Sequence, residues 1–121
     1  MTEIWRTFTF DAAHRLPNVQ EGHKCARLHG HTYTVEIRLS GEVDAAAGWV
    51  RDFGDLKAAF KPLEEKLDHR LLNEIPGLEN PTSEILAQWL WDRLITDLPE
   101  LSRVSVSETA NSGVVYQGAR A

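Results

Sequence analysis

Alternation of apolar and polar residues marks both ends of the chain. Residues 4–12 and 33–40 alternate apolar and polar side chains, and shorter runs of the same kind cover residues 104–109 and 114–117. Successive side chains of a strand point to opposite faces, so a period of two predicts a half-buried strand. The pattern therefore predicts two strands at the start of the chain and two at its end.

The middle of the chain has the spacing of two amphipathic helices. Apolar residues recur every three or four positions from Leu56 to Leu67, and Asp52 is placed to cap this helix. Pro62 lies inside the pattern, so we expect a kink or an early end there. Thr82 can cap the second helix, which Pro99 closes.

The elements follow one another as ββααββ, and 121 residues suffice for one domain, residues 1–121, with one core. Two hairpins and two amphipathic helices predict an α+β fold, with a four-stranded antiparallel sheet and both helices on one face. The other face and the sheet edges then need cover. We therefore expect a homo-oligomer.

The composition of the chain indicates which classes of partner and which cellular compartment to expect. Thirteen basic and 18 acidic side chains give a net charge of −5, which provides no overall attraction to nucleic acid or to an anionic membrane. The first ten residues alternate where a signal peptide would need a basic start and an apolar run, and no apolar stretch approaches bilayer-spanning length. The single cysteine cannot form an internal disulfide. We expect a cytoplasmic protein that holds any anionic substrate by local contacts.

Four of the five histidines lie between residues 14 and 31. His29 and His31 are two residues apart on a predicted strand, so their imidazoles point the same way, and a hairpin brings His14 beside them. Three neutral imidazoles with a fourth position open are the ligand set of a catalytic zinc ion. The sequence thus predicts a Zn²⁺ site at these residues, against the alternative of strand-end histidines without metal. Spacing alone leaves His23 and Cys25 open as ligands.

Three further features could move protons or bind a ligand. Cys25 precedes His29 by four residues, and a nearby cation would favour its thiolate, although a lone cysteine is often a small buried residue. Asp68 and His69 are adjacent and could relay a proton, or His69 could simply lie at a helix end where the dipole favours it. Glu108 could accept two hydrogen bonds from a flat ligand, or lie solvated at a strand edge.

The order of motifs resembles that of a known family. The segments that carry the resemblance are FDAAHRLP, EGHKCARLHGHTY, GEVD, DFGDLKAAFKP, LDHRLLN, IPGLENPTSE and SET, which together span nearly the whole chain. They resemble the 6-pyruvoyltetrahydropterin synthase superfamily, and within it the bacterial members that form 6-carboxytetrahydropterin. The resemblance implies the tunnelling fold, in which the sheets of three subunits form a barrel and two trimers stack into a homohexamer with shared active sites.

The resemblance also implies a role for each candidate residue. In this family pattern, the zinc ligands are His14, His29 and His31. The proton-transferring thiol is Cys25, and its relay partners are Asp68 and His69. The pterin anchor is Glu108. Arg15, Lys24 and Arg27 are candidates for binding triphosphate, with a solvated basic loop as the alternative. His23 receives no role.

The implied reaction converts 7,8-dihydroneopterin triphosphate into 6-carboxytetrahydropterin, with loss of acetaldehyde and triphosphate, on the way to 7-deazaguanines such as queuosine. Three residues separate Cys25 from His29, whereas pyruvoyl-forming relatives carry a longer loop, so the resemblance favours carbon–carbon cleavage. The alternatives are pyruvoyl-tetrahydropterin formation from the same substrate and a zinc-stabilised binding module without turnover. The chain departs from its relatives at Ser107 and in the turn at residues 110–113, both near the expected pterin end.

Overall fold

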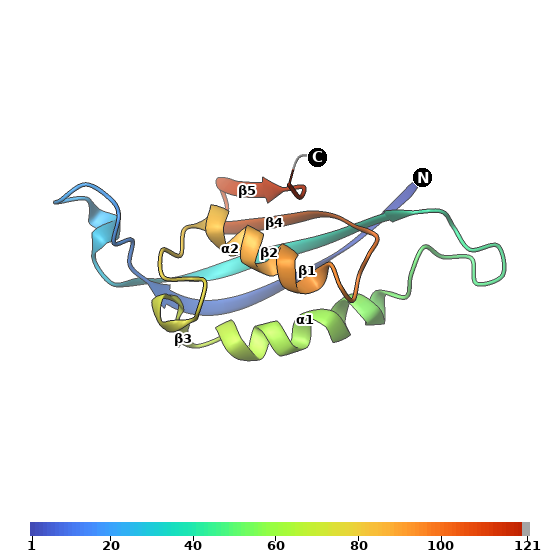
Figure 1. Ribbon diagram of the computed structural model, residues 1–121, viewed down its shortest axis with the longest axis horizontal. Coiled ribbons are helices and arrows are strands. Elements are labelled where there is room, and N and C mark those ends of the chain that lie inside the picture. The colour runs from blue at the N-terminus through green and yellow to red at the C-terminus, as the bar shows by residue number, and fades with distance from the viewer. Residues whose placement is uncertain (120–121) are drawn as a thin grey trace.

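A sheet of long strands carries two helices on one of its faces (Figure 1). The computed structural model describes residues 1–119. The elements are, in order, β1 (Thr2–His14), the 3₁₀ turn η1 (Lys24–Ala26), β2 (His29–Gly41), α1 (Phe53–Leu67), β3 (Arg70–Leu71), the 3₁₀ turn η2 (Leu72–Glu74), α2 (Ser83–Leu94), β4 (Leu101–Thr109) and β5 (Ser112–Tyr116). The predicted α+β class and the order of the long elements are confirmed.

The sheet has five strands in the order β3-β1-β2-β4-β5, where the sequence predicts four. β1, β2, β4 and β5 pair antiparallel as expected. The fifth strand, β3, pairs parallel with β1 through only two residue pairs, Ala12 with Arg70 and Ala13 with Leu71. Two residues carry no readable period, which is why the sequence pattern missed this strand.

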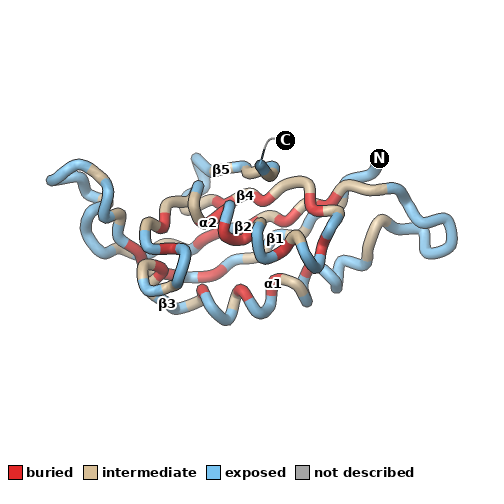
Figure 2. The backbone as a smooth tube through the Cα atoms, in the orientation of Figure 1, coloured by how far each residue is buried: buried red, intermediate tan, exposed pale blue. Residues whose placement is uncertain are grey.

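The core lies between the helices and one face of the sheet (Figure 2). Alternate residues of β2, namely Tyr33, Val35, Ile37 and Leu39, are fully buried. Both helices contribute to the same core cluster, and the ring of Phe60 on α1 stacks on Phe8 of β1 with centroids 4.4 Å apart. The opposite face of the sheet bears exposed side chains such as Trp5, which is 53% exposed.

Helix α1 begins as predicted but ends later. Asp52 caps it, as expected, by accepting a hydrogen bond of 2.8 Å from the Gly54 amide. The helix continues past Pro62 to Leu67, so an early end is wrong. A proline inside a helix costs about 3 kcal/mol, which the burial of Leu63 and Leu67, at roughly 1.5–3 kcal/mol each, offsets. Within residues 1–119, no helix is long and apolar enough to cross a membrane.

Candidate active site

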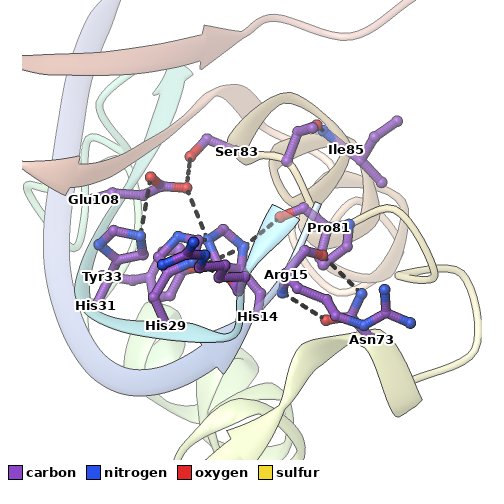
Figure 3. Close-up of polar contacts among 12 residues, drawn as sticks. His14, Arg15, His29, His31, Tyr33, Asn73, Pro81, Ser83, Ile85 and Glu108 are labelled. Carbon is purple, nitrogen blue, oxygen red and sulfur yellow. Dashed lines mark hydrogen bonds and ion pairs between the residues drawn. The ribbon is translucent and has the colours of Figure 1, made fainter. Parts of the chain in front are cut away.

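The pairing of β1 with β2 brings three histidines together (Figure 3). His14, the last residue of β1, lies opposite His29, the first residue of β2, while His31 lies opposite Ala12. One ring nitrogen from each histidine lies within 4.8 Å of the others, and the Nε2 atoms of His14 and His29 are 3.1 Å apart. The hairpin prediction for these residues is therefore correct in its geometry.

Backbone carbonyls orient two of the imidazoles. The Nδ1 atom of His14 lies 2.8 Å from the Pro81 carbonyl oxygen, and Nδ1 of His29 lies 2.7 Å from the Arg27 carbonyl oxygen. A carbonyl oxygen only accepts, so each Nδ1 carries the hydrogen and each Nε2 presents its lone pair to the cluster. This is the arrangement in which outer partners hold histidine ligands of a metal. The hydroxyl oxygen of Tyr33 also lies 3.1 Å from Nδ1 of His14.

The separation of the His14 and His29 nitrogens suits two ligands of one tetrahedral metal. Zinc–nitrogen bonds of about 2.0–2.1 Å at tetrahedral angles separate two ligand nitrogens by about 3.3–3.4 Å, close to the 3.1 Å between His14 and His29. The Nε2 atom of His31 is buried and has no hydrogen-bond partner within residues 1–119, a costly state that a bound cation would relieve. Burial lowers the pKa of His14, which is 1% exposed, and so favours the neutral form that binds metals.

Glu108 stands beside this cluster. Its Oε2 atom is 3.4 Å from Nε2 of His31, and its Oε1 atom is 3.9 Å from Nε2 of His14, so the carboxylate lies within ion-pair distance of both imidazoles. Oε1 accepts a hydrogen bond of 2.9 Å from the hydroxyl of Ser83, at the start of α2. The carboxylate, which is 27% exposed, is therefore held between the histidines and the start of α2.

Cys25 shares a cavity with two of the histidines. This thiol cavity, of about 420 Å³, is lined by Lys24, Cys25, His29, His31, Glu108 and Thr109. The ring of His23 accepts a hydrogen bond of 3.0 Å from the Cys25 amide and so caps η1, which gives His23 a structural place. The Cys25 carbonyl accepts from the Leu16 amide at 2.8 Å, which fixes this turn beside the end of β1.

Asp68 and His69 lie at a different place, where α1 ends next to β1. Nδ1 of His69 is 2.9 Å from a carboxylate oxygen of Asp68, and this hydrogen bond raises the pKa of His69. The backbone of Asp11 donates to Asp68 and accepts from His69, at 3.0 and 2.6 Å. His69 has φ of 59°, a left-handed conformation that non-glycine residues adopt at some cost. Neither residue lines the thiol cavity, so the described part of one chain does not bring this pair to Cys25.

Comparison with known proteins identifies the family. The model of the family described as 6-pyruvoyl tetrahydropterin synthase matches residues 3–119. The chain belongs to this family. The resemblance read from the motifs is confirmed, and the chain stands among the lyases that process pterins.

Known proteins similar to this chain align with almost its whole length. The chain is 41% identical over 119 residues to the 6-carboxy-5,6,7,8-tetrahydropterin synthase of Synechocystis, covering 93% of this chain and 91% of that one. It is 38% identical to the dihydroneopterin monophosphate aldolase of Pyrococcus furiosus, covering 88% and 89% of the two chains. The structure of the 6-pyruvoyl tetrahydropterin synthase of Caenorhabditis elegans superposes with a TM-score of 0.90 at 28% identity, covering 98% and 96%.

The basic residues predicted to bind triphosphate lie at different places around the site. Lys24 lines the thiol cavity, whereas Arg15 and Arg27 are exposed on the same loop and do not line it. A second cavity, of about 380 Å³, lies at the start of α2 and shares Glu108 with the first; we call it the helix-end cavity. Glu84 lines it and was missed from sequence, although its place in the first turn of a predicted helix was readable.

Proposed function

We propose that this chain is a zinc-dependent lyase that converts 7,8-dihydroneopterin triphosphate and one water molecule into 6-carboxy-5,6,7,8-tetrahydropterin, acetaldehyde and triphosphate, as a step toward 7-deazaguanines such as queuosine. The observation that carries the proposal is the thiol cavity, in which Cys25 faces the same space as His29 and His31. In this cavity, a metal bound by the histidines and the proton-transferring thiol would contact the same part of a substrate. The likeness to the Synechocystis enzyme supports this product.

The proposed roles follow from the surroundings of each group. Zn²⁺ held by His14, His29 and His31 would act as a Lewis acid toward the side-chain oxygens of the substrate. Cys25 transfers protons to and from the side-chain carbons, and Lys24 lines the same cavity. The triphosphate then extends along the exposed basic loop.

The ring of the pterin requires a carboxylate away from the metal. The amino and amide donors of a pterin lie across two fused rings from the carbon that bears the side chain. Glu108 is only 3.4 Å from a histidine nitrogen, so we assign it to the side-chain end of the substrate. Glu84, in the helix-end cavity, is proposed to pair with the ring donors. This proposal differs from the pterin-anchor role that the resemblance implies for Glu108, because it gives that role to Glu84.

The Asp68–His69 pair is proposed to act on Cys25 of a neighbouring copy. Both side chains are accessible in one chain and lie outside its own thiol cavity, so a second chain must approach for them to take part. The sheet offers surfaces for such contact, since one face is uncovered and the edge strand β5 exposes Val115. A homohexamer built from two trimers would supply this arrangement.

The product distinguishes this proposal from its nearest rivals. Relatives of nearly full length are named as carboxytetrahydropterin synthase, pyruvoyl synthase and monophosphate aldolase, so the family alone leaves the cleaved bond open. The spacing between Cys25 and His29 is shorter than in pyruvoyl-forming relatives, and this resemblance to the carboxy-forming members favours carbon–carbon cleavage. A misplacement of a reacting group by about 1 Å is enough to change a rate greatly, so the shorter loop can alter which step the thiol serves.

Product analysis tests the proposal. Zinc-loaded protein is incubated with 7,8-dihydroneopterin triphosphate, and the pterin and carbon fragments are identified, with the Cys25→Ala variant as control. Acetaldehyde released in step with triphosphate and 6-carboxytetrahydropterin is the expected result. Accumulation of pyruvoyl-tetrahydropterin would favour the rival synthase. Absence of turnover in a protein that binds zinc would favour a binding module.

A further inference from the structure

Asn73, in η2, binds the chain immediately after the metal-site residue His14. Its Oδ1 atom accepts a hydrogen bond of 3.0 Å from the amide of Arg15, and its Nδ2 group donates one of 2.8 Å to the carbonyl of Arg15 (Figure 3). These two bonds use both ends of one side-chain amide, so they fix the orientation of the Arg15 backbone as well as its distance. The same Nδ2 group also lies 3.4 Å from the carbonyl oxygen of Glu79.

The loop between η2 and α2 carries the carbonyl that orients His14. Residues 75–82 contain neither a helix nor a strand, and their backbone hydrogen bonds are local, such as that of 2.9 Å between the Thr82 amide and the Asn80 carbonyl. The Pro81 carbonyl nevertheless lies 2.8 Å from Nδ1 of His14. This carbonyl, together with the Tyr33 hydroxyl 3.1 Å from the same nitrogen, holds the imidazole with its Nε2 lone pair on the cluster.

We propose that Asn73 is a positioning residue of the metal site, because it ties the end of β1 to the loop that holds His14 in its ligating orientation. Asn73 itself does not reach the three nitrogens. It acts on them through two short hydrogen bonds to the Arg15 backbone, next to His14, and through one long hydrogen bond of 3.4 Å to the Glu79 carbonyl, two residues before Pro81. Without these attachments the Pro81 carbonyl would orient the imidazole of His14 less firmly toward His29.

The proposal rests on the zinc site of the proposed function, and its test is metal affinity. Outer partners of metal-bound histidines typically change affinity by about 10–100-fold when they are removed. We therefore expect Asn73→Ala to raise the zinc Kd of the full-length protein by this factor, measured by competition with a chromogenic chelator at fixed pH. The visible absorption of the cobalt-loaded variant should also lose intensity as the tetrahedral geometry relaxes.

Asn80→Ala is the matched control, because it removes the same type of side chain from the loop that follows η2, and no hydrogen bond of the Asn80 side chain is present within residues 1–119. The control should bind zinc like the wild type. Equal zinc affinity in Asn73→Ala and wild type, or an equal loss in both variants, would overturn the proposal. Failure of the wild type to bind zinc would instead defeat the zinc site itself. If Asn73→Ala does not fold, Asn73→Ser, which keeps one hydrogen-bonding group, is assayed in its place with the same criteria.

Discussion

Replacing His31 with alanine should show separately how this residue affects the stability of the metal-free fold and how it contributes to metal affinity. The Nε2 atom of His31 is buried without a hydrogen-bond partner in the described part of the chain, a state that costs about 1–3 kcal/mol. Its ring also packs edge-on against His14, His29 and Tyr33. Such aromatic pairs contribute roughly 0.5–1.5 kcal/mol each. The two effects oppose each other, so metal-free wild type and His31→Ala should unfold at similar temperatures.

Zinc should distinguish the two proteins. A ligand at 100 times its Kd stabilises the folded state by about 2.7 kcal/mol. The entropy of unfolding is roughly 2.1 cal/mol/K per residue, so for 121 residues this stabilisation corresponds to a rise in Tm of about 11 °C. Removing an outer partner of a metal ligand can already weaken binding by about 100-fold. If His31→Ala loses affinity by this factor, zinc at the same concentration stabilises the folded variant by only about 0.4 kcal/mol, and its Tm rises by under about 2 °C.

Thermal unfolding of both proteins with and without zinc, at equal protein concentration, is the assay. His23→Ala is the control, because it removes an imidazole that caps η1 and lies outside the cluster of three. The His23→Ala variant should keep the full zinc-dependent rise in Tm. A rise of the wild-type size in His31→Ala would refute the assignment of His31 as a ligand.

Four other variants test the neighbouring groups. Cys25→Ala should keep its zinc-dependent rise in Tm yet lose about 10²–10⁴-fold in turnover, the usual share of a proton-transferring group; loss of zinc would make Cys25 a ligand instead. Glu84→Gln should weaken binding of a pterin that lacks the side chain, measured by calorimetry, whereas Glu108→Gln should spare that ligand; the reverse order would return the ring to Glu108. Asp68→Asn should lower the pKa of His69 in an NMR titration, because the carboxylate raises it in the wild type, and an unchanged value would contradict the ion pair. Stability from this pair is present below the ordinary histidine pKa and is lost as pH rises through the raised value.

The periodic parts of the chain could be predicted because one property repeats along them. Alternation in β2 matches the fully buried Tyr33 and Val35, and the cap of α1 at Asp52 follows from residue type. The histidine cluster could be predicted for the same reason, since parity and a hairpin suffice to bring His14 beside His29. Features that depend only on local geometry are therefore readable from the residues alone.

Contacts between distant segments could not be predicted in this way. The carbonyl of Pro81 lies 67 residues from His14 in the chain, and the amide of Asn73 lies 58 residues from Arg15, with no pattern that links either pair. The separation of Asp68 from the thiol cavity was also hidden, because the resemblance implies roles without giving their places in one chain. Tertiary packing decides such contacts, and only the structure contains it.

Titration of turnover against zinc tests the central claim most directly. Metal-free protein receives increasing zinc, and acetaldehyde released from 7,8-dihydroneopterin triphosphate is measured at each step. The account predicts that the rate rises in proportion to zinc and levels off at about one ion per chain, the capacity of one cluster of three histidines. Full turnover without added metal, or no turnover at one zinc per chain, would contradict it.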